Sequence, residues 1–480
     1  MREVLPPRKI KEVVSLATLP PPVDVNSNPY LTGCFEAVTN EGVWPNLTAT
    51  TGELPADIVG TYIRNGPNPR FTPIGSYVYP VDGDGMVHAI TLSDGVAVYR
   101  NKFVRTPMLK REEEVGHALW GGIMSGVVPG EEEAGPALAN QWKDLPDINV
   151  VRHHGKLIAL AEMSRSYSLG DKLETLDPVT YGGVFAQGTC AHPKVDPVTG
   201  EMIVFTYGLE APFLTWAVIG ADGQVTSGPH AVDTPKSCMI HDFAITATSI
   251  VLVVNPLIFD LEAAMSGGSL LSWKPELGCR IAVISRKTGA VTWHQGDAFW
   301  TWHFANAHDV DGGLVVDAVV WDRPGFGEHD DHTPSKGTFS RLTLPRTSDA
   351  INHQILVDRP MEFPRIDDRL IGQVHHQVAV GARTGREVPP GEFDAVLTIN
   401  PESGSVTAFD AGTLSVGEPC FVPSSDGSTG GYYVTYATDR TTMRSSFVVL
   451  AADDVAAGPV ATIELPVRVP LGLHGAWLPI

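Results

Sequence analysis

The stretch "RIAVISRKTGAVTWHQ", residues 280–295, contains the pattern on which the fold depends. Two runs rich in β-branched and aromatic residues flank a turn that contains Thr-Gly. A glycine-containing turn between two extended apolar runs is the sequence signature of a β-hairpin. The same pattern recurs in "HAITLSDGVAVYR" (88–100), in "EMIVFTYG" with "AVIGADGQVTSGP" (201–208 and 217–229) and in "AVLTINPESGSVTAFDAG" (395–412). The chain is therefore predicted to consist mainly of antiparallel hairpins.

Regular hairpins along most of the 480 residues favour one large all-β domain, residues 1–480, with a proline-rich N-terminal arm at 1–28. A β-propeller with blades of about 40–45 residues fits this spacing best. A pair of β-sandwiches would give a similar pattern, and no repeated motif separates the two alternatives. The best helical candidate is "PMLKREEEVGHALW" (107–120), and its glycine-rich continuation to residue 136 is predicted to be a loop.

Composition excludes several classes of protein. The formal net charge of −21 argues against binding to nucleic acid, because such proteins concentrate lysine and arginine. The five cysteines are scattered and form no Cys-x-x-Cys pair, so neither a disulfide framework nor a zinc–thiolate site is expected. The longest apolar run, "SIVLVVNPLIF", is shorter than the ~20 residues of a membrane-spanning helix. The N-terminus lacks the apolar core of a signal peptide, so a cytoplasmic protein is expected.

Four of the sixteen histidines stand at the edge of an apolar stretch beside turn residues: His192, His241, His303 and His474. If they converge, each comes from a different hairpin, which the axis of a propeller permits. One of them lies five residues before His308 in "FWTWHFANAHDVDGG" (299–313). Alternate residues of a regular strand face opposite sides, so the two histidines cannot both point inward. His303, which lies among aromatic residues, is the predicted inward histidine, and His308 is interpreted as an ordinary one.

A series of motifs in the chain resembles, in order, the carotenoid cleavage oxygenase family, which includes lignostilbene dioxygenases and the retinal pigment epithelium isomerase. The motifs are "NPYLTGCFEAVTNE", "GTYIRNGPNPRF", "DGDGMVHAI", "YRNKFVRT", "AHPKVDPVTGEM", "HDFAIT", "HFANAHD", "MEFPRID", "GEPCFVP" and "VPLGLHGAW". The resemblance runs nearly from end to end. It implies a seven-bladed β-propeller, with loops and short helices that form a dome over one face. It also implies an iron ion on the propeller axis.

The resemblance assigns the metal ligands and the acids behind them. Four histidines match the iron ligands of the family: His192, His241, His303 and His474. Three glutamates match the residues that hold those histidines, in the pairs Glu162–His241, Glu362–His303 and Glu418–His474. This leaves His192 without a carboxylate partner. A buried carboxylate is costly unless it is paired, and a hydrogen bond from a ligand histidine supplies the pairing and fixes the ring.

The function implied is that of an Fe(2+)-dependent dioxygenase that cleaves a C=C bond of a carotenoid or apocarotenoid to carbonyl products. Its partners would be a conjugated hydrophobic substrate and dioxygen, with no organic cofactor, no protein partner and no catalytic side chain beyond the metal centre. Phe103 and Ala161 stand where stilbene cleavers carry tyrosine and lysine, which disfavours the alternative, a stilbenoid or phenylpropenoid alkene. A catalytically silent propeller that binds a hydrophobic ligand or a partner protein would not need this intact set of histidines and glutamates.

Further positions bear on the substrate and on the membrane. The expected substrate tunnel contains Phe103, Ile148, Ala161 and Phe304, and Ile148 replaces a threonine that many members have. The segment "ALWGGIMSGVVPG" (118–130) is interpreted either as an apolar patch for peripheral membrane contact or as a buried part of the dome. Asp82 and Asp84 are interpreted as turn formers, and the role of Asp309 is left open.

Overall fold

Hairpins organise the chain as the sequence predicts. The structure is a computed structural model that describes residues 19–266, 269–325, 335–425 and 430–480; residues 1–18 of the N-terminal arm lie outside this part. The hairpin quoted first forms strands β18 (Cys279–Ser285) and β19 (Val291–Gly296), which are antiparallel with Ile281 opposite His294. Gly289 occupies the left-handed region between them with φ 71°, a conformation that glycine adopts without steric cost.

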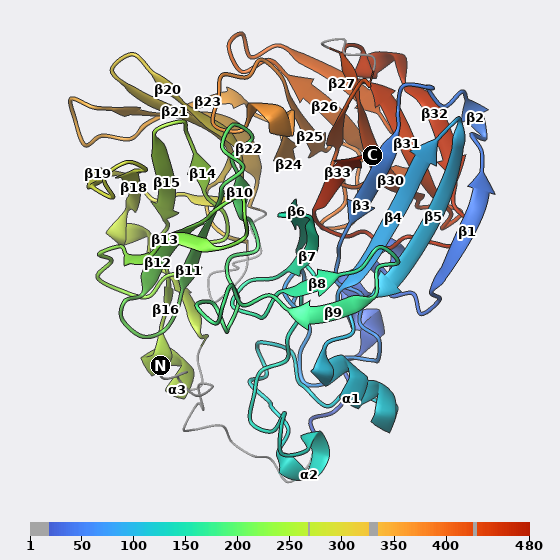
Figure 1. The fold of residues 1–480 in the computed structure, drawn as a ribbon, viewed down its shortest axis with the longest axis horizontal. Coiled ribbons are helices and arrows are strands. Elements are labelled where there is room, and N and C mark those ends of the chain that lie inside the picture. Colours follow the sequence, from blue (N-terminus) through green and yellow to red (C-terminus); the bar gives the residue numbers. More distant parts are fainter. Residues whose placement is uncertain (1–18, 267–268, 326–334, 426–429) are drawn as a thin grey trace.

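Within the described residues, seven sheets of four or more strands follow one another around a ring (Figure 1). Blade 1 joins the two ends of the chain, because β3 pairs with the final strand β33 and so closes the ring. Its strands, from the axis outward, are β33 (Gly475–Pro479), β3 (Gly60–Arg64), β4 (Met86–Ser93), β5 (Val96–Phe103) and β1 (Gly42–Leu47). In Figure 1 the blue β3–β5 and the red β30–β32 accordingly lie next to each other.

Blades 2 to 4 follow in chain order. Blade 2 contains β6 (Asn149–His153), β7 (Lys156–Leu160), β8 (Tyr167–Leu169) and β9 (Thr175–Pro178). Blade 3 contains β10 (Lys194–Val195), β11 (Met202–Tyr207), β12 (Leu214–Ile219) and β13 (Val225–Ala231). Blade 4 contains β14 (Ala244–Ile245), β15 (Ser249–Val254), β18 and β19, and carries a separate hairpin of β16 (Leu257–Phe259) and β17 (Leu271–Trp273).

Blades 5 to 7 complete the ring. Blade 5 contains β20 (Trp300–Val310), β21 (Gly313–Trp321), β22 (Gly337–Pro345) and β23 (Asn352–Val357). Blade 6 contains β24 (Met361–Arg365), β25 (Val378–Ala382), β26 (Ala395–Ile399) and β27 (Val406–Asp410). Blade 7 contains β28 (Leu414–Val416), β29 (Cys420–Pro423), β30 (Gly431–Asp439), β31 (Ser445–Ala451) and β32 (Pro459–Glu464), with β2 (Thr51–Gly52) at its outer edge.

Apolar side chains on facing blades hold the ring together. In blades 4 and 5, for example, Val251, Val316 and Leu342 belong to one fully buried cluster. Burial of apolar surface contributes about 25 cal/mol per Å², so each blade is stabilised by its two neighbours. This arrangement confirms the predicted seven-bladed propeller and excludes the pair of sandwiches.

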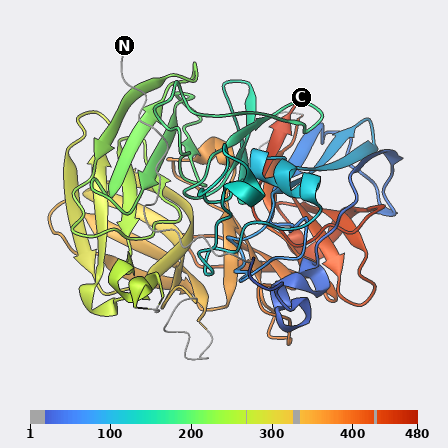
Figure 2. The same cartoon turned by 90° about the horizontal axis from the view of Figure 1, so that it is seen from below.

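Helices are short and lie mainly outside the blades. Helix α1 (Pro107–Val115) begins where the Thr106 side chain accepts a hydrogen bond from the Leu109 amide and ends at Gly116, which has φ 83°. With α2 (Glu131–Ala134) and the loops up to residue 145 it forms the dome, which in Figure 2 (cyan) lies between the yellow-green and the blue and red blades. The remaining short helices are α3 (Leu261–Met265) and the 3-10 turns Val25–Ser27, Pro29–Leu31, Gly33–Phe35, Pro275–Leu277, Asp368–Leu370 and Val455–Ala457.

Candidate metal centre

Each of the seven blades contributes one of the side chains that the sequence singled out. For blades 1 to 7 they are, in order, His474, Glu162, His192, His241, His303, Glu362 and Glu418. Six of them lie on or close to the innermost strand of their blade, and Glu162 follows β7, the second strand of blade 2. Inner strands of a propeller approach one another only near the axis, so residues far apart in sequence meet there. The structure thus brings all seven predicted side chains together.

The four imidazoles converge on a common point. All four histidines are buried, and one nitrogen of each lies within 4.8 Å of the others. The Nε2 atoms of His192 and His241 are 3.1 Å apart, and those of His241 and His303 are 3.2 Å apart. The His474 ring stands edge-on to its neighbours, with its centroid 4.4 Å from that of His192 and 4.5 Å from that of His303.

Behind three of the imidazoles stands a carboxylate, and those of Glu362 and Glu418 are buried whereas that of Glu162 is partly buried. The Nδ1 atom of His303 lies 2.6 Å from Glu362 Oε2, and that of His474 lies 2.9 Å from Glu418 Oε1. His241 Nδ1 makes the same contact with Glu162 Oε1. These are the three pairs that the resemblance implied. Because a carboxylate only accepts hydrogen bonds, each Nδ1 carries the proton and each Nε2 presents a lone pair to the centre.

This donor set suits a metal cation. Two lone pairs 3.2 Å apart, on His241 and His303, repel each other unless a cation, either a proton or a metal ion, lies between them. The Nε2 atom of His474 is buried and has no hydrogen-bond partner among the described residues. Buried nitrogens are rarely left unpaired, and an unpaired nitrogen that faces other imidazoles is typical of a metal ligand. Metal binding by these four histidines stays a prediction that this geometry supports.

The charge state of the centre also fits metal binding. Burial, together with the imidazoles of His474, His241 and His303, holds the pKa of His192 well below its ordinary value. Burial lowers the pKa of His474 to about 4, although Glu418 opposes the change. Metal ions bind the neutral imidazole, so a low pKa keeps these two rings ready to coordinate near neutral pH.

Two further pKa shifts concern the carboxylate–histidine pairs. Burial alone would raise the pKa of Glu418, but Arg365 and His474 outweigh it and lower the value to about 2. The pKa of His303 is raised, because the neighbouring Glu362 carboxylate outweighs the effect of burial. Glu418 therefore stays ionised, and its negative charge lies directly behind the His474 imidazole.

The sequence did not predict the second partner of each carboxylate. Tyr207 donates its hydroxyl to Glu162 at 2.6 Å, and the Trp321 indole N–H donates to Glu362 at 2.8 Å. Glu418 accepts from the Arg365 guanidinium at 3.0 Å. Only Arg365 had a visible signal, since it shares the "MEFPRID" motif with one glutamate. Tyr207 and Trp321 lie on strands whose sequence gives no sign of a buried carboxylate nearby.

Tight backbone geometry accompanies two of the glutamates. Met163 and Phe363, each of which directly follows a glutamate of the centre, have positive φ angles of 49° and 58°. This left-handed conformation is uncommon for residues other than glycine and clusters at functional sites. On β24 a register shift lies between Glu362 and Arg365. The local bend allows both side chains of that strand to reach buried partners.

The comparison of His303 with His308 corrects one step of the sequence argument. Both histidines are buried, 9% and 5% exposed, although strict alternation allowed only one to point inward. Strand β20 is irregular, with register shifts between Thr301 and Phe304 and between Phe304 and Asn306. A bulge resets the alternation, so an odd separation no longer implies opposite faces. His303 joins the imidazole cluster, whereas the His308 ring lies 5.8 Å from that of His375.

The residues expected in the substrate tunnel fall into three places. Ile148 and Ala161 share one apolar cluster, which includes residues adjacent to the ligands, and the His474 amide donates to the Ile148 carbonyl at 3.1 Å. Phe103 instead packs with Met86 under α1. Phe304 belongs to the core between blades 4 and 5. The structure therefore brings only two of the four next to the imidazoles.

The segment 118–130 is divided between the two interpretations. Leu119 and Trp120 are 2% and 4% exposed and belong to the core of the dome. Ile123 and Met124 are 43% and 51% exposed. The first pair therefore fits the buried dome element, and only the second pair remains available for contact with a membrane.

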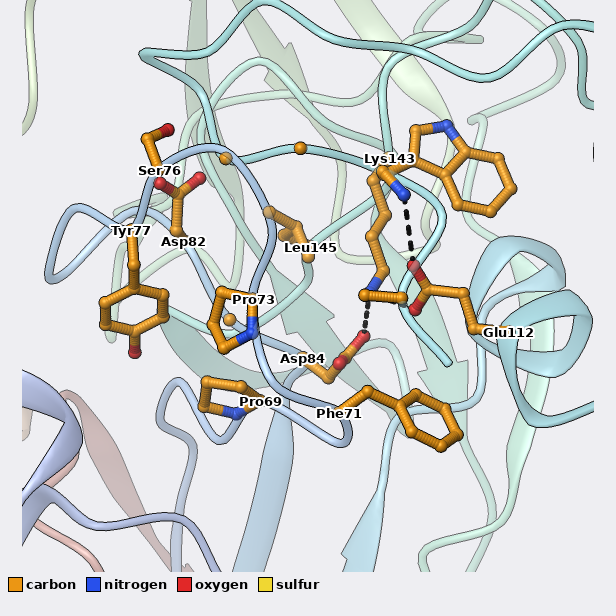
Figure 3. A pocket seen from close by; sticks show the side chains of 15 residues that line it. Pro69, Phe71, Pro73, Ser76, Tyr77, Asp82, Asp84, Glu112, Lys143 and Leu145 are labelled. Carbon is orange, nitrogen blue, oxygen red and sulfur yellow. Dashed lines mark hydrogen bonds and ion pairs between the residues drawn. The ribbon is translucent and has the colours of Figure 1, made fainter. Parts of the chain in front are cut away.

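The two aspartates interpreted as turn formers do more than shape a turn. Asp82 accepts hydrogen bonds from the Val78 and Ile123 amides, which ties its loop to the dome. Asp84 forms an ion pair with Lys143 at 2.7 Å, and Lys143 also pairs with Glu112 of α1 at 2.6 Å (Figure 3). We call Asp84, Glu112 and Lys143 the dome charge cluster.

The residue whose role the sequence left open, Asp309, joins two blades. Its carboxylate accepts from the Thr248 hydroxyl at 2.8 Å and from the Thr248 amide at 3.2 Å. Thr248 lies in blade 4 between β14 and β15, and Asp309 lies on β20 of blade 5. The contact is therefore a structural link between neighbouring sheets.

Comparison with known proteins gives matches over nearly the whole chain. Residues 35–479 match the family described as retinal pigment epithelial membrane protein. An isoeugenol monooxygenase from Pseudomonas nitroreducens is 29% identical, with 89% of this chain and 93% of the relative covered. A carotenoid 9,10(9',10')-cleavage dioxygenase from Crocus sativus is 30% identical, with 94% and 89% covered. The solved lignostilbene dioxygenase of Pseudomonas brassicacearum is 30% identical and has a TM-score of 0.87, with 97% of this chain and 100% of that chain covered.

Proposed function

The chain belongs to the family of the retinal pigment epithelial membrane protein and the carotenoid cleavage oxygenases, and we propose that it is a non-haem dioxygenase that cleaves a C=C bond of a carotenoid or apocarotenoid. It is an oxidoreductase that incorporates dioxygen and releases two carbonyl products. The observation that carries the proposal is the convergence of four buried imidazoles, three of them held by carboxylates, at the propeller axis.

Iron(II) is the metal that this donor set fits best for such a reaction. Four imidazoles would complete a tetrahedral zinc site, which is a closed structural arrangement. Iron(II) would be held by the same four histidines and would supply the activation of dioxygen towards the alkene. The charges of Glu162, Glu362 and Glu418 then balance the dipositive ion, although they do not coordinate it.

The residues of the chain orient the ligands and exclude water. Each of the three glutamates fixes its imidazole through the Nδ1 proton, so the rings keep one tautomer and one orientation. Ile148, Ala161, Ala191 and Leu473 form a buried apolar cluster beside the imidazoles. The Phe363 ring lies 5.5 Å from those of both His303 and His474. This apolar surrounding accepts a hydrocarbon chain and keeps water from the metal.

The choice of substrate class rests on two side chains. The relatives include both carotenoid and phenylpropenoid or stilbene enzymes. Phe103 and Ala161 are both buried, 1% and 3% exposed, and neither has a group that could bind or deprotonate a phenol, although only Ala161 lies in the apolar cluster beside the imidazoles. A hydrocarbon polyene makes no such demand. Cleavage of a stilbenoid or phenylpropenoid alkene by the same chemistry is the second candidate, which the isoeugenol and lignostilbene relatives favour.

One incubation tests the proposal. The iron(II)-loaded protein is mixed aerobically with apocarotenals, hydroxystilbenes and isoeugenol separately, and the carbonyl products are identified by mass spectrometry. We expect paired aldehydes from the apocarotenals, and none when the His303→Ala variant replaces the wild type. Products from the phenolic alkenes alone would move the function to the second candidate. No product from any alkene, with iron bound, would contradict the dioxygenase.

Peripheral contact with a membrane is a further part of the proposal. In the described part of the chain, no helix has both the length and the apolar character to cross a bilayer. Ile123 and Met124 are exposed on the dome, and apolar side chains there would insert into the surface of a membrane that holds a hydrophobic substrate. We expect the Ile123→Ser/Met124→Ser variant to lose flotation with phosphatidylcholine vesicles. Leu277→Ser, a change at a residue that is also half exposed but lies in blade 4, is the control; equal flotation of all three proteins would rule the contact out.

A further inference from the structure

The fourth imidazole, His192, poses a separate question, because no carboxylate hydrogen-bonds to its ring among the described residues. Its Nε2 faces His241, and the rings of three other histidines stand within 5.2 Å of its centroid. A ligand histidine whose Nδ1 lacks an acceptor is not oriented through that atom. The orientation of His192 must therefore come from its backbone and from the contacts of its neighbours.

The backbone on both sides of His192 is anchored to adjacent blades. Before it, the Ala191 carbonyl accepts from the Asn149 side-chain amide of blade 2 at 3.0 Å. After it, Pro193 fixes one backbone torsion, and Lys194 reaches blade 4, where its ammonium pairs with Asp242 at 2.7 Å. The side chains of Lys194 and Asp242 are 17% and 2% exposed, so the pair is largely removed from water.

Asp242 extends this link to a third blade. Its second oxygen, Oδ2, accepts from the Phe304 amide of β20 at 3.0 Å, while Oδ1 also accepts from the amide of Phe243. The Phe304 amide lies between the two register shifts of β20, where the regular ladder is interrupted and an N–H can turn sideways. The Asp242 carboxylate of blade 4 therefore contacts both neighbouring blades: Lys194 on β10 of blade 3 and the Phe304 amide on β20 of blade 5.

These contacts lie directly beside three ligand positions. Lys194 is two residues after His192, Asp242 is one after His241, and Phe304 is one after His303. We propose that Lys194 and Asp242 are positioning residues, which fix the spacing of blades 3, 4 and 5 and take the place, for His192, of the carboxylate that holds each of the other imidazoles. The inference rests on the proposed function only in that the four histidines bind one metal ion.

The structure offers a matched control in the same two blades. Arg286, which follows β18 of blade 4, pairs with Asp196, which follows β10 of blade 3, at 2.6 Å. The two side chains are 14% and 8% exposed, close to the values of the Lys194–Asp242 pair. The Arg286–Asp196 pair thus links the same two blades and is similarly buried. Asp196, however, lies two residues beyond Lys194 along the chain and therefore four residues after His192.

The experiment measures metal binding without turnover. Cobalt(II) is titrated into metal-free wild type, Lys194→Met, Asp242→Asn, Lys194→Arg and Arg286→Met, with the ligand-field absorption as readout and thermal unfolding as the test of folding. We expect Lys194→Met and Asp242→Asn to bind cobalt about 10- to 100-fold more weakly, as other outer ligand contacts do, and with a changed spectrum. Lys194→Arg retains the ion pair and should stay within about threefold of wild type.

Each outcome decides the inference. Wild-type affinity in Lys194→Met would overturn it, as would an equal loss in Arg286→Met, because the effect would then be general weakening between blades. If Lys194→Met does not fold, Asp242→Asn, which can still accept from the Phe304 amide, provides the same comparison. Absence of cobalt binding in wild type would instead contradict the proposed metal centre, and the two failures are thus distinguishable.

Discussion

The candidate metal centre and the dome charge cluster both bury carboxylates that come from separate parts of the chain, but they balance the charge differently. In the dome, Asp84 and Glu112 lie 2.7 and 2.6 Å from the ammonium of Lys143 (Figure 3). At the axis, in the described part of the chain, the imidazole Nε2 atoms meet without a lysine or arginine between them. A buried charge is tolerated only when it is paired.

The difference separates a structural cluster from a site. Burial alone would lower the pKa of Lys143, but Asp84 and Glu112 outweigh burial and raise it, so the ammonium stays charged. Glu112 also accepts from the Leu119 amide at 2.8 Å, and the cluster thereby ties α1 to the dome loops. Its cation is part of the chain, and the cluster is complete. At the axis Glu418 has such a cation in Arg365, but the lone pairs of the imidazoles face no cation among the described residues, and the proposed metal ion would complete the centre.

The largest effect is expected from a substitution that removes one of the four histidines. His303→Ala removes one of the converging nitrogens and leaves Glu362 without its imidazole, so bound iron should fall to background and turnover should cease. His308→Ala, on the same strand and equally buried, should lose about 0.5–3 kcal/mol of stability yet keep its iron. Metal analysis of the two purified variants checks this. Full iron content in His303→Ala would show that His303 is not a ligand.

The second largest effect is expected from a substitution that disrupts the dome charge cluster but leaves the four histidines and three glutamates unchanged. Lys143→Met leaves two buried carboxylates without their cation, which should reduce the free energy of unfolding by about 3–5 kcal/mol. Urea denaturation of the metal-free protein measures the loss. The exposed pair Lys336–Asp358 supplies the control, because Lys336→Met should cost about 0–1 kcal/mol. Cobalt affinity lowered by Lys143→Met would mean that the two regions are coupled.

The third effect sharpens the role of the carboxylates at the axis. Glu362→Gln keeps the shape of the side chain but removes its charge, so metal affinity should fall about 10- to 100-fold, with a small change in stability. Cobalt titration measures the affinity. The control is Glu402→Gln, at a half-exposed residue that pairs with Arg341, and this change should leave the cobalt affinity unchanged. Equal affinities in Glu362→Gln and wild type would reduce Glu362 to a packing residue.

Sequence patterns predicted the hairpins and the dome helix well, because their signals are local. The turn in residues 280–295 and the Thr106–Pro107 start of α1 act within a few residues. The helix nevertheless ended at Val115, earlier than the apolar pattern to residue 120 suggested, because Gly116 adopts the left-handed conformation that terminates it. The inward choice of His303 agreed with the structure, although the irregular β20 invalidated the alternation from which it was argued.

The sequence by itself determined the antiparallel hairpins and, through motif resemblance, which histidines and glutamates to examine. Only the tertiary structure decided that Tyr207, Trp321 and Arg365 stand behind the glutamates and that Asp242 links three blades. The physical reason is the closure of the ring between β3 and β33. Closure brings the inner edges of seven separate hairpin units together, and no spacing along the chain encodes that proximity.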